Sequence, residues 1–154
     1  MFHRITLIGF VGQEPAMRYT EDGTPVTNFS VATRQVVSKE RVATCPQGWK
    51  ESLNGKNWEL TTWFRVTCWR RLAEAVNEYL DKGQQVFVQG ELRGEASEGN
   101  QNPRIWVGND GEHRASYEVT ARTVKFLGRR DNGNGAPIGE PPPDGGEDEE
   151  VLPF

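Results

Sequence analysis

The sequence predicts an all-β domain with a single helix, followed by an acidic tail. Short runs of alternating apolar and polar residues, typical of β-strands, recur through the first 130 residues. Apolar residues follow a helical spacing in one stretch, near residues 72–80. Residues 131–154 are dense in glycine, proline and acidic residues, and such a segment buries too little surface to offset its ordering entropy. We therefore expect a folded domain over residues 1–130 and a disordered tail over residues 131–154.

Three strands are predicted before the helix. Residues 5–11 alternate with apolar side chains on both faces, and residues 27–34 place Phe29 and Val31 on one face. A third strand is expected over residues 62–69. The polar segment between them, residues 35–61, contains proline, glycine and asparagine and is interpreted as a long loop or a floppy hairpin.

The helix and two further strands complete the domain. The helix is predicted from an apolar stripe with Gly83 as its C-terminal stop; the stripe consists of Leu72, Ala73, Val76, Tyr79 and Leu80. Residues 84–93 and 116–127 are predicted as the fourth and fifth strands, and residues 95–109 as an extended hairpin. The alternation slips between Ala121 and Val124, which predicts a β-bulge. Three strands, a helix and two strands is the order of an OB-fold, a five-stranded Greek-key barrel that binds oligonucleotides.

The charge of the chain is divided between the two parts. The net charge is −4, yet residues 1–130 hold all 18 lysines and arginines against 15 acidic residues. Residues 131–154 hold seven acidic residues and no basic one. This asymmetry indicates a net basic binding body with an acidic interaction tail, so the overall charge does not argue against a nucleic-acid partner.

The third strand carries the clearest functional pattern. Its alternation places Phe64, Val66 and Cys68 on one face and the set Trp63, Arg65, Thr67 and Trp69 on the other. The first set suits a barrel core, whereas an arginine between two tryptophans does not. On a surface the second set forms a stacking platform, with flat rings for bases and a guanidinium for phosphate. The alternative is that one tryptophan packs against a neighbouring hairpin or a second subunit.

The sequence offers no catalytic set. His3 and His113 are isolated, Cys45 and Cys68 form no disulfide framework, and no phosphate-binding glycine loop or nucleophile elbow is present. We therefore expect a protein that is not an enzyme, without a metal or another cofactor. The N-terminus lacks the pattern of a signal peptide and no apolar run is long enough to span a membrane, so we expect a cytoplasmic protein associated with the nucleoid.

Several stretches of the chain match a known family. They occur in the family's order over nearly the whole body, and they are residues 8–15 (IGFVGQEP), 28–33 (NFSVAT), 62–66 (TWFRV), 72–74 (LAE), 79–83 (YLDKG) and 86–93 (VFVQGELR). With the acidic tail ending in Pro-Phe, the chain resembles the bacterial single-stranded-DNA-binding protein family. The resemblance implies an OB-fold that assembles as a homotetramer and wraps single-stranded DNA during replication, recombination and repair.

The resemblance also implies which residues contact DNA. The base-stacking aromatics of the family correspond to Trp63 and Trp69, and the segment 106–114 assigns a third to Trp106. The matching basic positions are Arg4, Arg18 and Arg34, while Arg65 is placed by its strand face.

The chain departs from the family pattern in two loops. Residues 36–61 form a longer connection than usual, and Val37 stands where an aromatic residue is normal. Trp49 or Trp58 is a candidate substitute for that aromatic. The hairpin between Gly94 and Arg104 also looks extended, so the path of the DNA there can differ.

The end of the tail turns abruptly apolar. Relatives end in several acidic residues followed by Ile-Pro-Phe, and here the corresponding residues are Asp148, Glu149, Glu150, Leu152, Pro153 and Phe154, with Val151 where an acidic residue is usual. Phe154 offers a ring and a terminal carboxylate to a basic-rimmed apolar pocket, and the acidic residues steer it there. We expect this segment to dock replication and repair proteins.

Two other functions remain open from the sequence. An OB domain for protein interaction or assembly would bury the same aromatics in a protein interface, and an RNA-binding OB module would use the same platform. Oligo-dT competing with oligo-U separates DNA from RNA binding.

Overall fold

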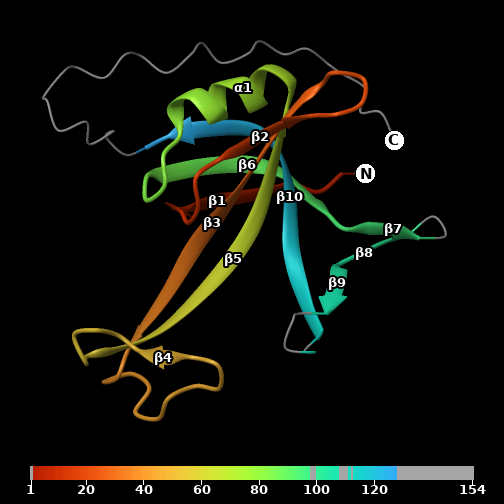
Figure 1. The fold of residues 1–154 in the computed structure, drawn as a ribbon. Coiled ribbons are helices and arrows are strands. Elements are labelled where there is room, and N and C mark those ends of the chain that lie inside the picture. The colour runs from red at the N-terminus through yellow and green to blue at the C-terminus, as the bar shows by residue number, and fades with distance from the viewer. Residues whose placement is uncertain (1, 98–99, 108–110, 112, 128–154) are drawn as a thin grey trace, which may run out of the picture.

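The computed structural model describes residues 2–127, apart from residues 98–99, 108–110 and 112. The predicted tail and its docking segment lie outside the described residues. The elements, drawn in Figure 1, are β1 (Ile5–Val11), β2 (Ala16–Tyr19), β3 (Pro25–Ser38), β4 (Lys50–Glu51), β5 (Asn57–Trp69), α1 (Arg70–Tyr79), β6 (Gln85–Arg93), β7 (Glu95–Ser97), β8 (Asn100–Asn102), β9 (Arg104–Val107) and β10 (His113–Phe126).

The described strands form a closed barrel. Five of them are ordered β3-β1-β6-β10-β5 within this part of the chain, and pairing of β3 with β5 closes the ring. The β5–β10 pair is parallel, whereas the other four barrel pairs are antiparallel. Helix α1, the one helix of the described residues, covers one end of the barrel (Figure 1). The predicted OB-fold is confirmed.

The core follows the alternation of the strands. Inward-facing residues such as Val31, Val66, Val86 and Val88 have no solvent exposure. Full burial of a side chain of this size contributes about 1.5–3 kcal/mol. The helix joins the core through Ala73 and Val76, and Leu80 directly after it is also buried, as predicted. The buried Thr27 hydroxyl donates a hydrogen bond of 2.7 Å to the Ala73 carbonyl, which attaches the helix to β3.

The helix differs from its prediction at both ends. It starts directly at the end of β5, where Arg70 takes a left-handed backbone conformation with a φ of 54°. It ends at Tyr79 because the next residue, Leu80, is already extended. Gly83, with a φ of 82°, belongs to the following turn, so its assignment as the helix stop was wrong. Tyr79 was also wrongly counted in the apolar stripe, since its side chain is exposed, and a hydrogen bond with Glu78 raises its pKa.

The predicted bulge is present in β10. The pairing with β6 shifts register between Ala121 and Thr123, so the inward positions change from Ala121 to Val124. Gly90 lies opposite the start of the bulge, paired with Ala121. A Cβ atom on Gly90 would stand 2.1 Å from the Thr120 carbonyl oxygen, so the two backbones approach too closely for any side chain. Glycine at this position therefore permits the curvature of the barrel.

The segment 35–61 is more ordered than predicted. Strands β3 and β5 stay paired beyond the barrel as far as Ser38 opposite Asn57, and β4 adds a short third strand. This extension, residues 34–61, projects from the barrel in Figure 1, and we call it the arm. The long-loop interpretation was wrong and the hairpin alternative is correct, because cross-strand pairing holds polar residues such as Gln35 in a strand. The short strand β2, which pairs with the start of β3, was not predicted.

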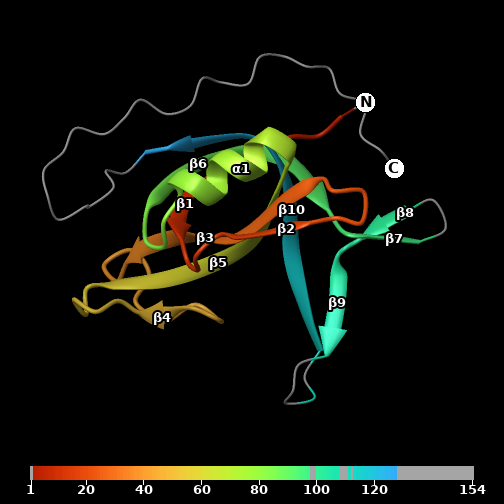
Figure 2. The ribbon, with the colours of Figure 1, turned by 45° about the horizontal axis from the view of Figure 1, so that its top comes forward.

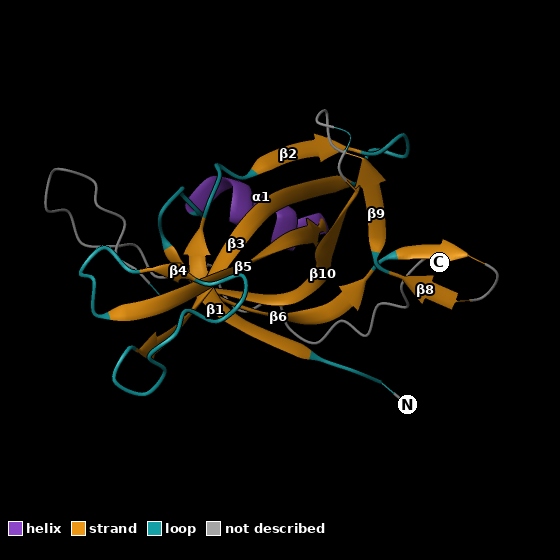
Figure 3. Cartoon of the chain, turned by 90° about the horizontal axis from the view of Figure 1, so that it is seen from below, coloured by secondary structure: helices purple, strands orange, loops and turns teal. Residues whose placement is uncertain are grey.

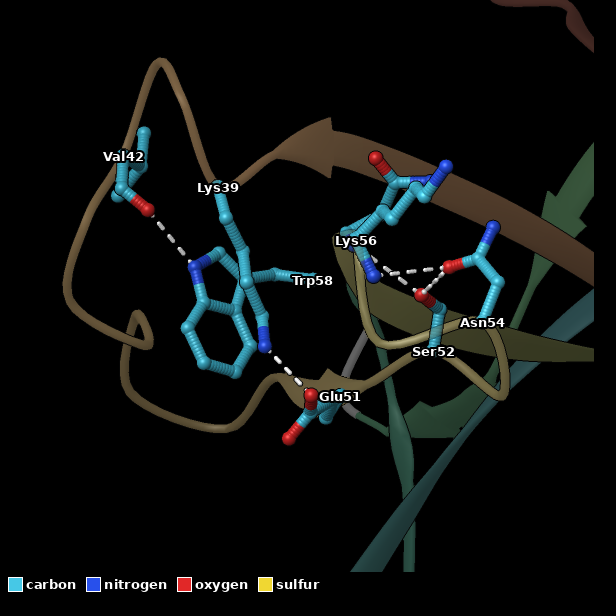
Figure 4. Close-up of polar contacts among 8 residues, drawn as sticks. Lys39, Val42, Glu51, Ser52, Asn54, Lys56 and Trp58 are labelled. Carbon is cyan, nitrogen blue, oxygen red and sulfur yellow. Dashed lines mark hydrogen bonds and ion pairs between the residues drawn. The ribbon is translucent and has the colours of Figure 1, made fainter.

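The tip of the arm is organised around Trp58. Its indole N–H donates a hydrogen bond of 2.8 Å to the Val42 carbonyl, and the Lys39 ammonium lies 4.4 Å from the centre of its ring (Figure 4). Lys39 also forms an ion pair of 2.5 Å with Glu51 on β4. The buried Ser52 closes the adjoining turn, accepting a hydrogen bond from the Asn57 amide.

Candidate nucleic-acid interface

The two faces of β5 separate as the alternation predicts. Val66 and Cys68 have no solvent exposure and Phe64 packs against the core. On the opposite face Trp63 is 54% exposed and Trp69 is 44% exposed. Two large exposed aromatic side chains on one strand face are unusual unless that surface serves recognition.

Strand β3 contributes the residues that pair with this face, of which Val26 is buried and the other three are partly exposed. Ala32 pairs with Trp63, Ser30 with Arg65, Asn28 with Thr67 and Val26 with Trp69. We call these eight residues the strand track. The Thr67 hydroxyl donates a hydrogen bond of 2.8 Å to the Asn28 side-chain oxygen, and this contact joins the two strands at the middle of the track. The Ser30 hydroxyl is buried and lacks a hydrogen-bond partner among the described residues.

Two neighbouring strands widen the strand track. In β2, Arg18 pairs with Val26 and so lies in the same row as Trp69. In β1, Phe10 pairs with Ala32 and lies in the row of Trp63, with 55% of its surface exposed. The sequence reasoning missed Phe10, because alternation within β1 is apolar on both faces and does not reveal which strand lies beside it.

Gly12 supports the ring of Trp63. A Cβ atom on Gly12 would stand 2.3 Å from the Cζ3 atom of the Trp63 ring and 2.9 Å from the Ser30 hydroxyl oxygen. The Gly12 amide also donates a hydrogen bond of 2.9 Å to the Ser30 carbonyl, which fixes the backbone beneath the ring. Glycine here lets the ring lie directly over the main chain.

Replacing Gly12 by alanine should therefore displace the Trp63 ring. We expect affinity for single-stranded DNA to fall by about threefold to tenfold, within the value of one stacking contact. The free energy of unfolding should change little, because the clashing ring atoms lie at the end of a half-exposed side chain that can move. Labelled oligo-dT binding and a thermal melt measure the two effects. Unchanged affinity would contradict a supporting role for this glycine.

Trp106 lies on a separate ribbon. Strand β9 pairs with β10, and Trp106, opposite Arg114, is 42% exposed. Four residues further along β10 from Arg114, Glu118 pairs with Arg65 of β5. Residues an even number of positions apart share one face of a strand, so Trp106 lies on the same outward side of the sheet as Arg65. Figure 3 shows β9 and the β4 end of the arm on different sides of the barrel. The structure therefore brings Trp106 to the same side of the sheet, on a ribbon that is separate from the strand track.

The basic residues fall into three environments. Arg18 and Arg65 form no ion pair with a carboxylate in the described part of the chain. Arg34, on the arm, forms an ion pair of 3.4 Å with Glu59. Arg4 precedes β1, and its guanidinium lies 5.9 Å from the centre of the Phe2 ring. It is six residues from Phe10, or about 20 Å along an extended chain, so the structure does not bring it to the strand track.

The two remaining tryptophans differ from the exposed ones. Trp58 is half-buried, with its N–H bonded to Val42 and Lys39 over its ring, so it holds the arm together. Trp49 is half-buried in the same tip, and the Cys45 thiol contacts its carbonyl. Trp58 therefore has a structural role at the tip of the arm.

Within the ranges that the structure describes, no three histidine, cysteine or acidic side chains are grouped as a metal site would require. Burial in the core raises the pKa of the Cys68 thiol, which keeps it protonated. In the same ranges, no helix combines the length and apolar character needed to cross a membrane.

The barrel, its capping helix and the outward row of rings and guanidinium groups define a protein of the OB-fold class. The profile described as "Single-strand binding protein family" matches residues 2–127. The chain belongs to this family.

Individual relatives agree with the family. A protein named single-stranded DNA-binding protein from Neisseria meningitidis is 34% identical over 139 residues, covering 90% of this chain and 67% of the relative. Single-stranded DNA-binding protein 1 of Xylella fastidiosa is 34% identical over 132 residues, covering 86% and 82%.

Solved structures show the same fold. The small single-stranded DNA-binding protein from Streptomyces coelicolor has a TM-score of 0.57 at 22% identity, covering 81% of this chain and 94% of that one. The Plasmodium falciparum protein in complex with single-stranded DNA has a TM-score of 0.55 at 25% identity, covering 82% and 96%.

Proposed function

We propose that this protein binds single-stranded DNA without sequence preference, through the strand track, and has no catalytic activity. The observation that carries the proposal is the pair of exposed rings, Trp63 and Trp69, with Arg65 between them on one strand. Flat rings stack on any base because every base has a π face, and the guanidinium meets the phosphate between two stacked bases. Arg18 adds a second positive charge in the row of Trp69, on the far side of β3.

A direct test is titration of labelled oligo-dT by fluorescence anisotropy at low and high salt. Binding should weaken with salt by about 0.7 in the log–log slope for each phosphate contact. Mixed-sequence DNA should bind comparably, and oligo-U should compete less well than oligo-dT. No measurable binding would refute the proposal, and equal competition by oligo-U would favour an RNA-binding module instead.

We further propose that copies of the chain cover the outer surface of β1, β6 and β10 to form a homotetramer. This surface exposes Ile8 at 56% and Leu127 at 50%, with the half-buried Phe87 between them. Apolar groups on adjacent strands favour association, because their burial removes them from water. Light scattering with chromatography measures the mass, and a monomeric mass would contradict this assembly.

We also propose that the tail docks partner proteins. Asp148 to Glu150 give a negative approach, and Leu152 to Phe154 give an apolar end, which together suit a basic-rimmed pocket on replication and repair proteins. The protein would then work in the cytoplasm, at the nucleoid, with the folded domain on DNA and the tail on its partners.

Deleting residues 151–154 should leave the affinity for oligo-dT within about twofold of the parent, because the strand track is untouched. The same deletion should abolish recovery of partner proteins in a pull-down with full-length protein as the reference. Unchanged recovery of partners would argue against a docking tail without affecting the DNA-binding proposal.

A further inference from the structure

The strand track continues onto the arm, and its charge changes there. Moving outward along β5 from Trp63, the next residues on the same face are Thr61 and then Glu59. On β3 the corresponding positions are Arg34, opposite Thr61, and Val36, opposite Glu59. Arg34 is therefore the next basic residue that a strand lying over Trp63 would meet.

Arg34 does not present a free positive charge. Its Nη1 atom lies 3.4 Å from the Oε1 atom of Glu59, and the two side chains are 64% and 16% exposed. Val36, which faces Glu59, is 50% exposed and offers no hydrogen-bonding group. Arg65 and Arg18, by contrast, form no ion pair with a carboxylate of the described residues.

The shape of the arm holds Glu59 in this position. Glu59 lies between β3 and β4, opposite Lys50 of β4, and the adjacent residue Trp58 is fixed by its contacts with Val42 and Lys39 (Figure 4). The backbone of Glu59 is therefore paired on both sides, and its carboxylate lies beside Arg34.

We propose that Glu59 is a negative determinant of DNA binding: it masks Arg34 and limits how far a single strand extends from the strand track onto the arm. A phosphate that reaches Arg34 must displace the carboxylate and then lie close to a like charge. Exposed ion pairs are worth only about 0.2–1 kcal/mol, so the mask weakens this contact without blocking it. This inference rests on the proposed binding of single-stranded DNA.

The test is Glu59→Gln, which keeps the size and shape of the side chain and removes its charge. It should raise the affinity for oligo-dT by up to about fivefold per Arg34 engaged, the equivalent of an exposed ion pair. It should also make the salt dependence steeper by about 0.7 for each phosphate gained, which a merely structural effect would not do. In an Arg34→Gln background the same substitution should have no effect on affinity or slope.

Glu51→Gln is the matched control. Glu51 also pairs with a basic residue, Lys39, at 2.5 Å, but it lies on β4 near the tip of the arm and outside the strand track. Its removal should leave DNA affinity and salt dependence unchanged. If the parent binds oligo-dT and Trp63→Ala weakens binding, yet Glu59→Gln matches the parent in affinity and slope, this inference is overturned and the proposed function stands. If the parent fails to bind, the proposed function itself fails.

Discussion

Trp63→Ala and Trp69→Ala should each weaken binding to oligo-dT by about 5- to 150-fold, the range expected from losing one base stack of about 1–3 kcal/mol. Both rings are about half exposed and neither belongs to the core cluster, so their removal leaves the barrel packing in place. Anisotropy titrations at one fixed salt concentration measure the loss, and a thermal melt shows whether the domain remains folded.

Controls on the same chain separate stacking from general loss of aromatic surface. Tyr79→Ala removes an exposed ring from α1, outside the strand track, and should not change affinity. Trp63→Phe keeps a smaller ring and should bind with intermediate affinity. If both alanine variants bind oligo-dT as tightly as the parent, the strand track is not the binding surface.

Gly90→Ala should destabilise the domain by about 3 kcal/mol or more, because overpacking against a backbone cannot be relieved by a side-chain rotation. The new Cβ atom would lie 2.1 Å from the Thr120 carbonyl oxygen, opposite the bulge in β10. The melting temperature should fall by about 10–20 °C for a domain of this size. Differential scanning calorimetry gives the change.

Gly12→Ala is the natural reference for this substitution, since it is the same chemical change in the same barrel. There the Cβ atom meets a ring that can move, and at Gly90 it meets main chain. We expect Gly12→Ala to reduce DNA affinity with little loss of stability. We expect the main effect of Gly90→Ala to be a loss of stability of the folded domain. A Gly90→Ala protein that melts with the parent would disprove the close approach of β6 and β10.

The elements whose periodicity is local were predicted from the sequence. β1 matches its predicted bounds, the bulge between Ala121 and Thr123 follows from a slip in alternation, and the two faces of β5 follow from a period of two. Each of these signals lies within one strand. The spacing of apolar and polar residues within a single segment was therefore enough to predict each of these features.

Features that depend on pairing between distant segments could not be predicted in the same way. The arm exists because residues 34–38 and 57–61 lie opposite each other, which their polar composition does not reveal. Likewise, the proximity of Phe10 to Trp63 and of Glu59 to Arg34 comes from strand register. Arg4 was assigned by resemblance, and its place before β1 separates it from the strand track.

The enclosed position of Trp58 has a spectroscopic consequence. Five tryptophans contribute to the intrinsic emission of the protein, and Trp58 is held at the tip of the arm by Val42 and Lys39. Figure 2 shows that tip, marked by β4, at a distance from the β9 ribbon. Stacked bases would quench Trp63 and Trp69 while Trp58 continues to emit, so saturation should leave a residual signal. A Trp58→Phe protein should lose part of that residual signal, with Trp49 of the same tip still emitting, and report DNA contact with a larger fractional change.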